Sequence, residues 1–429
     1  MNFSNSKIAR NASWIIISKL LQSALSFVVG LLTARYLGPS NYGLINYAIS
    51  VVTFVLPIVQ LGFNNVLVHE LTNSPEKEGE LLGTSITLSF LSAVFCMIGV
   101  ISFVVVTDGG NKEMVWVVAI YSINLILQVF DLLQYWFQAK LMSKYCSITS
   151  LVAYIAVTCY KVFLLITSKN VYWFVMSYAI DYFIIAVMLL VIYRKLGGQK
   201  LAVDIKLGKQ LFSKSRHYIV PGLMVAIFSQ TDKIMLNNML GQTATGYYSA
   251  AVTVAMIPAF VYSAIIDSYR PVIFSNQSNQ EWFEQSLRQL YSIVIYISLA
   301  QSVVMTVFAE LIVGILYGAE FHEAVGALRI IVWFVTFSYF GSVRNIWMLA
   351  KDQQKYLWII NASGAALNVV LNILLIPVSG IIGAAIASLA TQMFSNFVLS
   401  FIIAPLRENN KILLSSLNPK HLLSLLKKN

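Results

Sequence analysis

Long apolar runs alternate with short polar breaks along the whole chain. Each run holds about 20 mostly apolar residues, the length that an α-helix needs to cross the hydrocarbon core of a bilayer. Several breaks have the composition of tight turns, such as residues 38–41 and 377–380. This pattern predicts an all-α integral membrane protein with about twelve transmembrane helices. The expected spans are 11–37, 42–68, 81–106, 114–138, 146–167, 171–193, 217–240, 246–274, 287–316, 327–350, 356–376 and 380–404.

The composition agrees with this pattern. Hydrophobic residues make up 58% of the 429 and charged residues 11%, and the mean hydropathy is +0.74. Soluble domains carry about 25% charged residues. Lipid must therefore cover most of the surface. The first run lacks a small-residue cleavage pattern, so we expect it to stay as a signal-anchor. Three cysteines show no metal-ligand spacing, and we interpret them as packing residues.

The distribution of lysine and arginine predicts the orientation. If the N-terminus is cytoplasmic, 21 of the 29 lysines and arginines fall in cytoplasmic segments, and only Lys112 and Lys169 fall in outer loops. Such an imbalance is the positive-inside signal of membrane proteins. It predicts that both termini are cytoplasmic. The net charge of +11 is thus explained by topology, and we expect no nucleic-acid partner.

A basic connection after the sixth run divides the chain into two sets of six spans. Residues 37–48 and 240–251 join the first two spans of each half and align without gaps, with four identities. Halves of like topology suggest a parallel repeat, an architecture of transporters with the site between the halves. The expected parts are an N-terminal six-helix lobe (1–193), a cytoplasmic basic linker (194–216), a C-terminal six-helix lobe (217–404) and an amphipathic basic tail (405–429).

The sequence argues against an enzyme. It has no long outer loop of the kind that membrane-bound sugar polymerases and ligases use to hold substrate. It also lacks a phosphate-binding Gly-Lys loop, a metal-ligand cluster and a nucleophile elbow. We therefore expect no catalytic residue and no metal site.

Polar residues form stripes inside the spans, where they are costly and tend to face a cavity or another helix. The fourth span carries Asn124, Gln128, Asp131, Tyr135 and Gln138 at spacings that place them on one helical face. We interpret this stripe as the lining of a wet cavity, because amides and hydroxyls suit a sugar chain. Helix–helix hydrogen bonding is the alternative, with equal weight for the shorter stripes. Those comprise Asn361, Asn368 and Asn372 in the eleventh span, and Gln22 with Lys19 in the first.

Embedded cations lie at two expected depths. Lys19, Arg270 and Arg344 lie toward the cytoplasmic side, and Arg35, Lys161 and Lys233 toward the outer side. Cations at both depths would suit an anionic headgroup that moves between leaflets. Snorkelling is the alternative for those near helix ends. The embedded carboxylates are partners of these cations or proton or cation sites: Asp131, Asp181, Asp232 and Asp267. Asp267 and Arg270 are three residues apart, which favours a structural pair.

Several motifs resemble a known family. Residues 34–43, 60–65 and 69–70 are similar to the opening of bacterial polysaccharide flippases of the Wzx type, which belong to the multidrug/oligosaccharidyl-lipid/polysaccharide (MOP) exporter superfamily. Residues 232–236 and 380–386 are also similar to that family. Arg35 and Asp232 are the embedded charges that lie within these motifs.

The resemblance implies a fold like that of multidrug and toxin extruders (MATE), with two six-helix lobes and alternating access. The expected cargo is an undecaprenyl-pyrophosphate-linked oligosaccharide of O-antigen or capsule synthesis, crossing the bacterial cytoplasmic membrane. Its pyrophosphate would contact the cations and its sugars the polar stripes. Other polysaccharide assembly proteins are expected partners, no cofactor is expected, and proton or sodium coupling stays open. The alternatives are a cation-coupled multidrug exporter and, third, a membrane polymerase or ligase. The flippase reading predicts that Lys161→Ala and Arg344→Ala impair polysaccharide display at normal protein levels.

Overall fold

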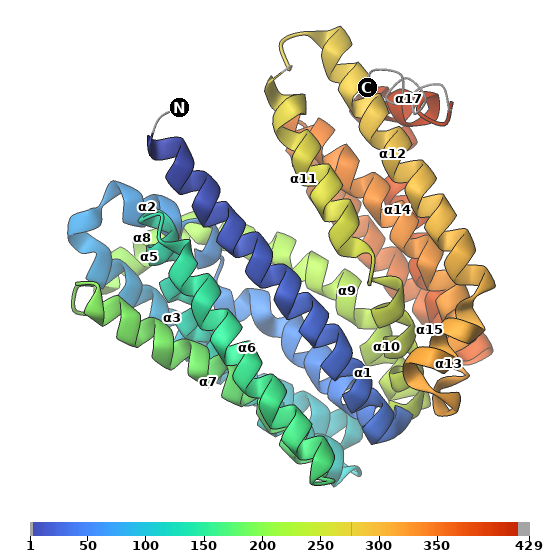
Figure 1. The fold of residues 1–429 in the computed structure, drawn as a ribbon, viewed down its shortest axis with the longest axis horizontal. Coiled ribbons are helices and arrows are strands. Elements are labelled where there is room, and N and C mark those ends of the chain that lie inside the picture. Colours follow the sequence, from blue (N-terminus) through green and yellow to red (C-terminus); the bar gives the residue numbers. More distant parts are fainter. Residues whose placement is uncertain (1–2, 276, 419–429) are drawn as a thin grey trace. The chain divides into compact units, whose positions relative to one another are not determined.

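The computed structural model describes residues 3–275 and 277–418, and these fold into helices without any β-strand. The chain forms two compact units, Met1–Gln230 and Thr231–Asn429, coloured along the chain in Figure 1. The all-helical architecture expected from the apolar runs is confirmed.

Unit 1 is built around the long helix α1, which packs against α3, α4 and α6, while α7 covers α4 and α6. Two short 3-10 turns flank α2, and a third, η3, interrupts the fourth expected span. The elements are α1 (Phe3–Gln60), η1 (Phe63–Asn65), α2 (Leu67–Asn73), η2 (Pro75–Lys77), α3 (Glu78–Asp108), α4 (Lys112–Leu127), η3 (Gln128–Leu132), α5 (Leu133–Ala139), α6 (Ser143–Ile166), α7 (Val171–Lys195), α8 (Ile205–Ser215), η4 (Arg216–Tyr218) and α9 (Ile219–Leu240), which continues into unit 2.

Unit 2 is organised around α14, which packs against α10, α12 and α15. A five-residue π-helical segment, η7 (Phe394–Val398), separates α15 from the short α16. The other elements are α10 (Gln242–Ala255), α11 (Ala259–Ser275), α12 (Gln280–Val307), α13 (Ala309–Tyr317), η5 (Ala319–Phe321), α14 (Ala324–Ala350), η6 (Gln354–Tyr356), α15 (Leu357–Met393), α16 (Leu399–Ile402), η8 (Ala404–Leu406) and α17 (Arg407–Ser415).

Within the described residues, nine helices are long and apolar enough to cross a membrane, or ten if the bent pair α10 and α11 is one span. This pair meets at an angle of 42°, next to Pro258, whose ring cannot continue a regular helix. Two of the candidates hold a non-helical glycine, Gly38 in α1 and Gly380 in α15. Each of these positions coincides with a break between two expected spans. The membrane-spanning class is confirmed, and the number twelve stays a prediction.

The two aligned turns have the same backbone conformation. Gly38 has φ 70° and ψ 174°, and Gly241, before α10, has φ 87° and ψ 177°. This region of backbone space is open almost only to glycine. The same backbone requirement therefore explains why glycine occupies both matched positions, which supports the expected internal repeat.

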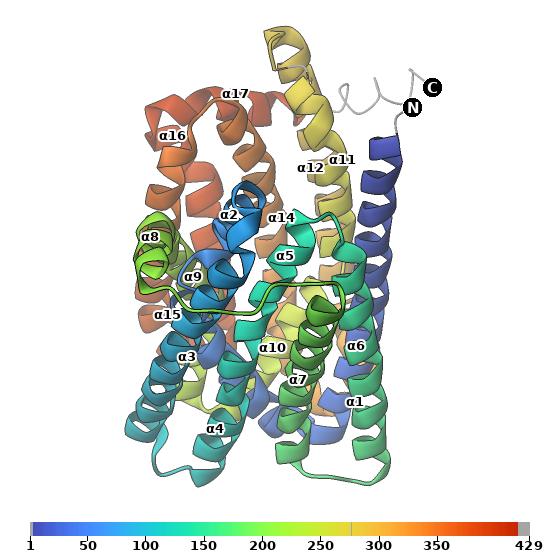
Figure 2. The same ribbon diagram turned by 90° about the vertical axis from the view of Figure 1, so that its left-hand side faces the viewer.

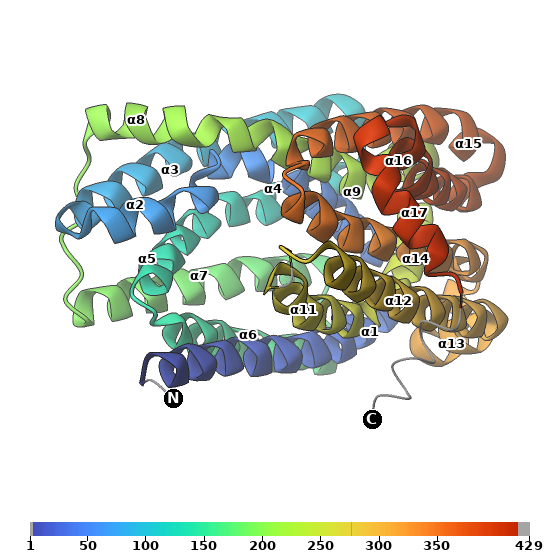
Figure 3. The same cartoon turned by 90° about the horizontal axis from the view of Figure 1, so that it is seen from above.

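The basic linker is packed against unit 1. Figure 2 shows the segment between α7 and α8 as an extended strap, and Figure 3 shows α8 beside α3. The Ala202 amide donates to the Gly79 carbonyl at 3.2 Å, and the Asp204 amide to Thr84 Oγ1 at 2.9 Å. These contacts tie the linker to α3, and the two compact units divide at residues 230–231, inside α9. The predicted lobes and linker stay a prediction.

Candidate functional site

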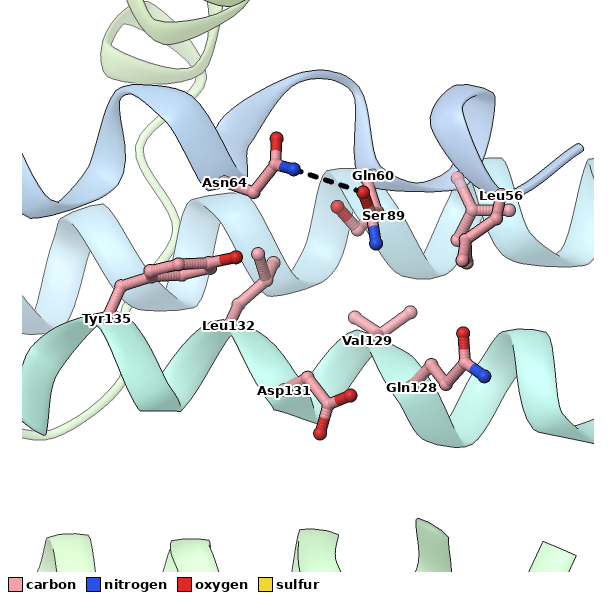
Figure 4. Close-up of a pocket in the computed structure, with 10 residues that line it drawn as sticks. Leu56, Gln60, Asn64, Ser89, Gln128, Val129, Asp131, Leu132 and Tyr135 are labelled. Atoms are coloured by element: carbon pink, nitrogen blue, oxygen red, sulfur yellow. Dashed lines mark hydrogen bonds between the residues drawn. The ribbon is translucent and has the colours of Figure 1, made fainter. Parts of the chain in front are cut away.

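The polar stripe of the fourth span is split by the 3-10 turn η3. A 3-10 helix advances 120° per residue instead of 100°, so five such residues turn the following positions by about 100°. In Figure 4, Gln128 and Tyr135 lie on the side toward α1 and α3, whereas Asp131 points away from them. Gln138 is exposed, and Asn124 is fully buried. Gln128, Asp131 and Tyr135 nevertheless border one pocket, whereas Asn124 and Gln138 are not among its lining residues.

Gln128, Asp131 and Tyr135 line a half-open pocket together with residues of α1, η1 and α3. Gln60, Asn64 and Ser89 supply its other polar side chains, and the Asn64 amide donates to Gln60 Oε1 at 3.2 Å (Figure 4). Its cavity of about 30 Å³ holds one or two water molecules at most. Among the described residues, Ser89 Oγ has no hydrogen-bond partner. Amides and hydroxyls in this number can bind water or the hydroxyl groups of a sugar.

Lys161 lies inside unit 1 against an aromatic face. Its ammonium is 4.2 Å from the ring centroid of Tyr178 on α7, within the range of cation–π attraction. The Tyr178 ring meets that of Tyr121 on α4 edge to face, with centroids 5.3 Å apart. Asp181, one turn further along α7, interacts electrostatically with both Lys161 and Asp131. The structure therefore brings three of the expected charged residues into one region.

The cation of this region has no close counter-ion. No carboxylate of the described residues lies within 4.0 Å of the Lys161 ammonium. In the same part of the chain, Asp181 Oδ1 is buried without a hydrogen-bond partner. The Lys161 ammonium can therefore still bind an anion, and the Asp181 carboxylate can still bind a proton.

Unit 2 holds a second polar cluster, centred on Asp232 of α9. Its carboxylate accepts hydrogen bonds from Asn368 at 3.0 Å and Asn372 at 2.7 Å on one oxygen, and from Tyr248 at 2.6 Å and Ser388 on the other. All five side chains are at most 7% exposed. Residues from α9, α10 and α15 thus surround one carboxylate, and the stripe of the eleventh span is explained by Asn368 and Asn372. Asn361 is half-buried and is not a member of this cluster.

Arg344 is buried in unit 2, with 3% of its surface exposed. Its Nη1 donates to the carbonyl of Ser395 in the π-helical segment at 2.8 Å, and its Nη2 to Asn345 Oδ1 at 3.3 Å. A π-helical turn shifts the backbone hydrogen bonds and leaves carbonyls that need other donors. The guanidinium supplies one of them, which gives Arg344 a structural role.

The remaining expected residues are dispersed. Arg270 lies 3.5 Å from Asp267, as the spacing suggested, and both side chains are exposed. Arg35 is exposed, Gln22 is half-buried, and Lys233 is half-buried beside Asp232. The side chain of Lys19 and residues 419–429 of the expected tail lie outside the described residues. The described part of the tail, α17, packs against α12 and α16.

Sequence reasoning missed several members of these clusters. Ser388 is a single polar residue among apolar neighbours, Tyr248 stands between Tyr247 and Ser249, and no periodicity marks either of them. Gln60 and Asn64 lie in a motif of the resemblance but were not assigned to a site, and Ser89 has no sequence signal. Among the described residues there is also no group of three or more His, Cys, Asp or Glu that could hold a metal ion.

Comparison with known proteins identifies the family. Residues 8–277 match the family described as "Polysaccharide biosynthesis protein". The capsular polysaccharide biosynthesis protein CapF of Staphylococcus aureus is 20% identical over 90% of this chain and 96% of its own length. An uncharacterized membrane protein of Methanocaldococcus jannaschii is 29% identical over 51% of this chain, and the match spans 45% of that protein. The probable low-salt glycan biosynthesis flippase Agl15 of Haloferax volcanii is 24% identical over 46% of this chain and 43% of its own length.

Solved structures show the same fold. The lipid II flippase MurJ, in an inward closed conformation, aligns with a TM-score of 0.72 at 16% identity, over 96% of this chain and 92% of that one. An inward-facing MATE transporter of the MOP superfamily aligns with a TM-score of 0.66 at 12% identity, over 90% and 96%. These likenesses confirm the expected fold. Because the family match covers more than half of the sequence, this chain belongs to the polysaccharide biosynthesis protein family and has the fold of the MOP superfamily.

Proposed function

We propose that this protein is a flippase that moves undecaprenyl-pyrophosphate-linked oligosaccharides from the cytoplasmic to the outer leaflet of the bacterial cytoplasmic membrane by alternating access. The repeat units would serve O-antigen or capsule synthesis. The distribution of lysine and arginine supports cytoplasmic termini. Family membership and the names of the relatives, a capsular biosynthesis protein and a glycan flippase, support the class of cargo.

The observation that carries this proposal is the ammonium of Lys161. It is half-buried in unit 1, on the face of Tyr178, and no carboxylate of the described residues lies within 4.0 Å of it. Asp181 acts on it only from farther away. A pyrophosphate would provide the missing counter-charge through charge-assisted hydrogen bonds. The pocket of Gln60, Asn64 and Gln128 in the same unit offers amides for sugar hydroxyls.

Display of surface polysaccharide by a strain that depends on this protein tests the proposal. A charge-assisted hydrogen bond contributes about 1.5–3 kcal/mol, so Lys161→Gln should lower transport roughly 10- to 100-fold, and Lys161→Arg should retain part of it. Lys169→Gln, which removes an exposed cation just beyond the same helix, is the matched control and should behave like the wild type. Normal display by Lys161→Gln would overturn the headgroup role.

We further propose that Asp232 is the coupling carboxylate. Amide orientation is assigned from hydrogen bonding. Turned by 180°, Asn368 and Asn372 would present oxygens to a cation, beside those of Ser388 and Tyr248. Oxygen-only sets of this kind suit hard cations such as sodium, and a proton on Asp232 is the other option. The residues present therefore fit either coupling ion.

Transport by vesicles under an imposed sodium or proton gradient tests this role. Asp232→Asn keeps the shape of the side chain but removes its charge, so transport should no longer respond to the gradient. Asp267→Asn, which alters an exposed carboxylate of the same unit, should respond like the wild type. An unchanged gradient response in Asp232→Asn would contradict the proposal, provided that its unfolding midpoint matches that of the wild type.

A further inference from the structure

Helix α8 carries two different faces. Gly208, Leu211 and Ser215 are buried, and the contacts of Gly208 are with Thr84 and Leu88 of α3. These three residues lie within about 60° of one another around the helix axis, at 100° per residue. One side of α8 is thus fully used in packing against unit 1.

The face next to it, here called the outer face, combines apolar and cationic side chains. Ile205 is 74% exposed and Phe212 is 41% exposed. Lys209 and Arg216, at the first residue after the helix, lie within about 40° of Ile205 around the axis, and Lys206 borders them. All three cations are exposed, and none forms an ion pair within the described residues. The helix itself contains no acidic residue.

This face is held in a fixed orientation. The Asp204 side chain caps α8 by accepting from the amides of Lys206 and Leu207 at 2.7 and 3.2 Å. At the other end, the Lys214 ammonium donates to both oxygens of Glu70 at 2.8 and 2.9 Å. Burial acts to raise the pKa of the Glu70 carboxyl, but Lys214 holds it below its usual value, so the carboxylate stays charged at neutral pH. Lys214 is therefore engaged, and Lys206, Lys209 and Arg216 remain for another partner.

We propose that the outer face of α8 binds the headgroups of anionic phospholipids, with Ile205 and Phe212 inserted at the membrane interface. An amphipathic helix with cations beside apolar side chains is typical of segments that lie in the interface. The cations also attract anionic lipid. From Lys206 to Arg216 they extend over about 15 Å, at 1.5 Å per residue. A row of this length fits a plane of neighbouring headgroups, whereas a single pyrophosphate would need cations that converge on one point.

A fluorescent label on the outer face tests the proposal in the full-length protein. The probe is an environment-sensitive dye on Ser213→Cys, with Cys96, Cys146 and Cys159 replaced by serine or alanine. The protein is reconstituted in vesicles of phosphatidylcholine with 0–50% phosphatidylglycerol, and quenching by brominated lipid is measured. Quenching should increase with the anionic fraction and decrease with added salt.

Neutralising the three cations should remove this dependence. For K206Q/K209Q/R216Q, the anionic fraction needed for half-maximal quenching should rise roughly 10-fold or beyond the range measured. The matched control is K195Q/K200Q, which removes two exposed cations of the same unit outside α8 and should leave the response unchanged. Equal unfolding midpoints establish that all variants are folded.

Three results would overturn the proposal. The first is quenching that does not depend on phosphatidylglycerol. The second is the same loss of response in the control variant. The third is a response to inorganic pyrophosphate in pure phosphatidylcholine vesicles at micromolar concentration, because it would assign the face to a soluble or substrate-borne anion.

Discussion

At the scale of single residues, their contacts distinguish two embedded cations to which the sequence assigned the same role. Lys161 and Arg344 were both expected to bind a headgroup. The structure places the Lys161 ammonium on an aromatic face, with no carboxylate of the described part of the chain within 4.0 Å. It engages the Arg344 guanidinium with the Ser395 carbonyl and Asn345. A buried guanidinium that satisfies a backbone carbonyl is needed for the fold before it is available to a ligand.

Replacement of Arg344 should therefore act on stability. Arg344→Met removes the charge but keeps much of the volume, and it leaves the Ser395 carbonyl without its donor. We expect a loss of about 1.5–3 kcal/mol, seen as a lower thermal-unfolding midpoint and less protein in the membrane. Arg329→Met, which changes an exposed arginine of the same helix, is the control. An Arg344→Met protein of wild-type stability that fails in transport would instead favour the headgroup role.

At the scale of elements, the strap between α7 and α8 depends on glycines of α3. A Cβ on Gly83 would lie 2.2 Å from the Ala202 carbonyl oxygen, and one on Gly79 would lie 2.4 Å from that of Lys200. Real atoms do not approach so closely, so only glycine allows the strap to lie against the helix. Gly99, on the same helix, would meet nothing within 4 Å.

Two substitutions on α3 should accordingly have opposite effects. Gly83→Ala should displace the strap and increase cleavage by protease at residues 196–204. Gly99→Ala should leave the strap protected and stabilise the helix by up to about 1 kcal/mol, because alanine favours helix over glycine. Limited proteolysis with a thermal-unfolding measurement distinguishes the two variants. Unchanged protection of the strap in Gly83→Ala would show that its docking does not need the close approach.

At the scale of the whole molecule, the turn before the second span of each half has one conformation. Gly38 and Gly241 both combine a positive φ with an extended ψ. Alignment of residues 37–48 with 240–251 is therefore supported by geometry as well as by four identities. The shared conformation restricts side-chain identity only at the glycines, and the internal repeat stays a prediction.

The conformation of Gly241 can be tested separately from packing. A Cβ at this position would meet nothing within 4 Å, so Gly241→Ala changes backbone strain alone. We expect a loss of about 1–3 kcal/mol in unfolding free energy. Gly314→Ala, also in open space but inside helix α13, should cause no loss. Equal stability of the two variants would contradict a strained turn at Gly241.

Much of the fold could be predicted because its signal is local. A run of apolar residues of sufficient length specifies a span by itself, and turn residues mark its ends. The candidate site was only partly predictable. Helical periodicity placed Asn368 and Asn372 together, and it placed Gln128, Asp131 and Tyr135 at one pocket. It did not foresee the 3-10 turn η3 at Gln128–Leu132, which changes the number of residues per turn.

The sequence alone determined the membrane class, the approximate spans and the family, since each depends on composition and order over short stretches. The tertiary structure decided which polar side chains meet. Asp232 contacts Ser388, 156 residues away, and Lys161 meets Tyr178 across two helices. Such contacts depend on how separate helices pack. The local sequence around a polar residue in an apolar run does not show which distant residue it will contact.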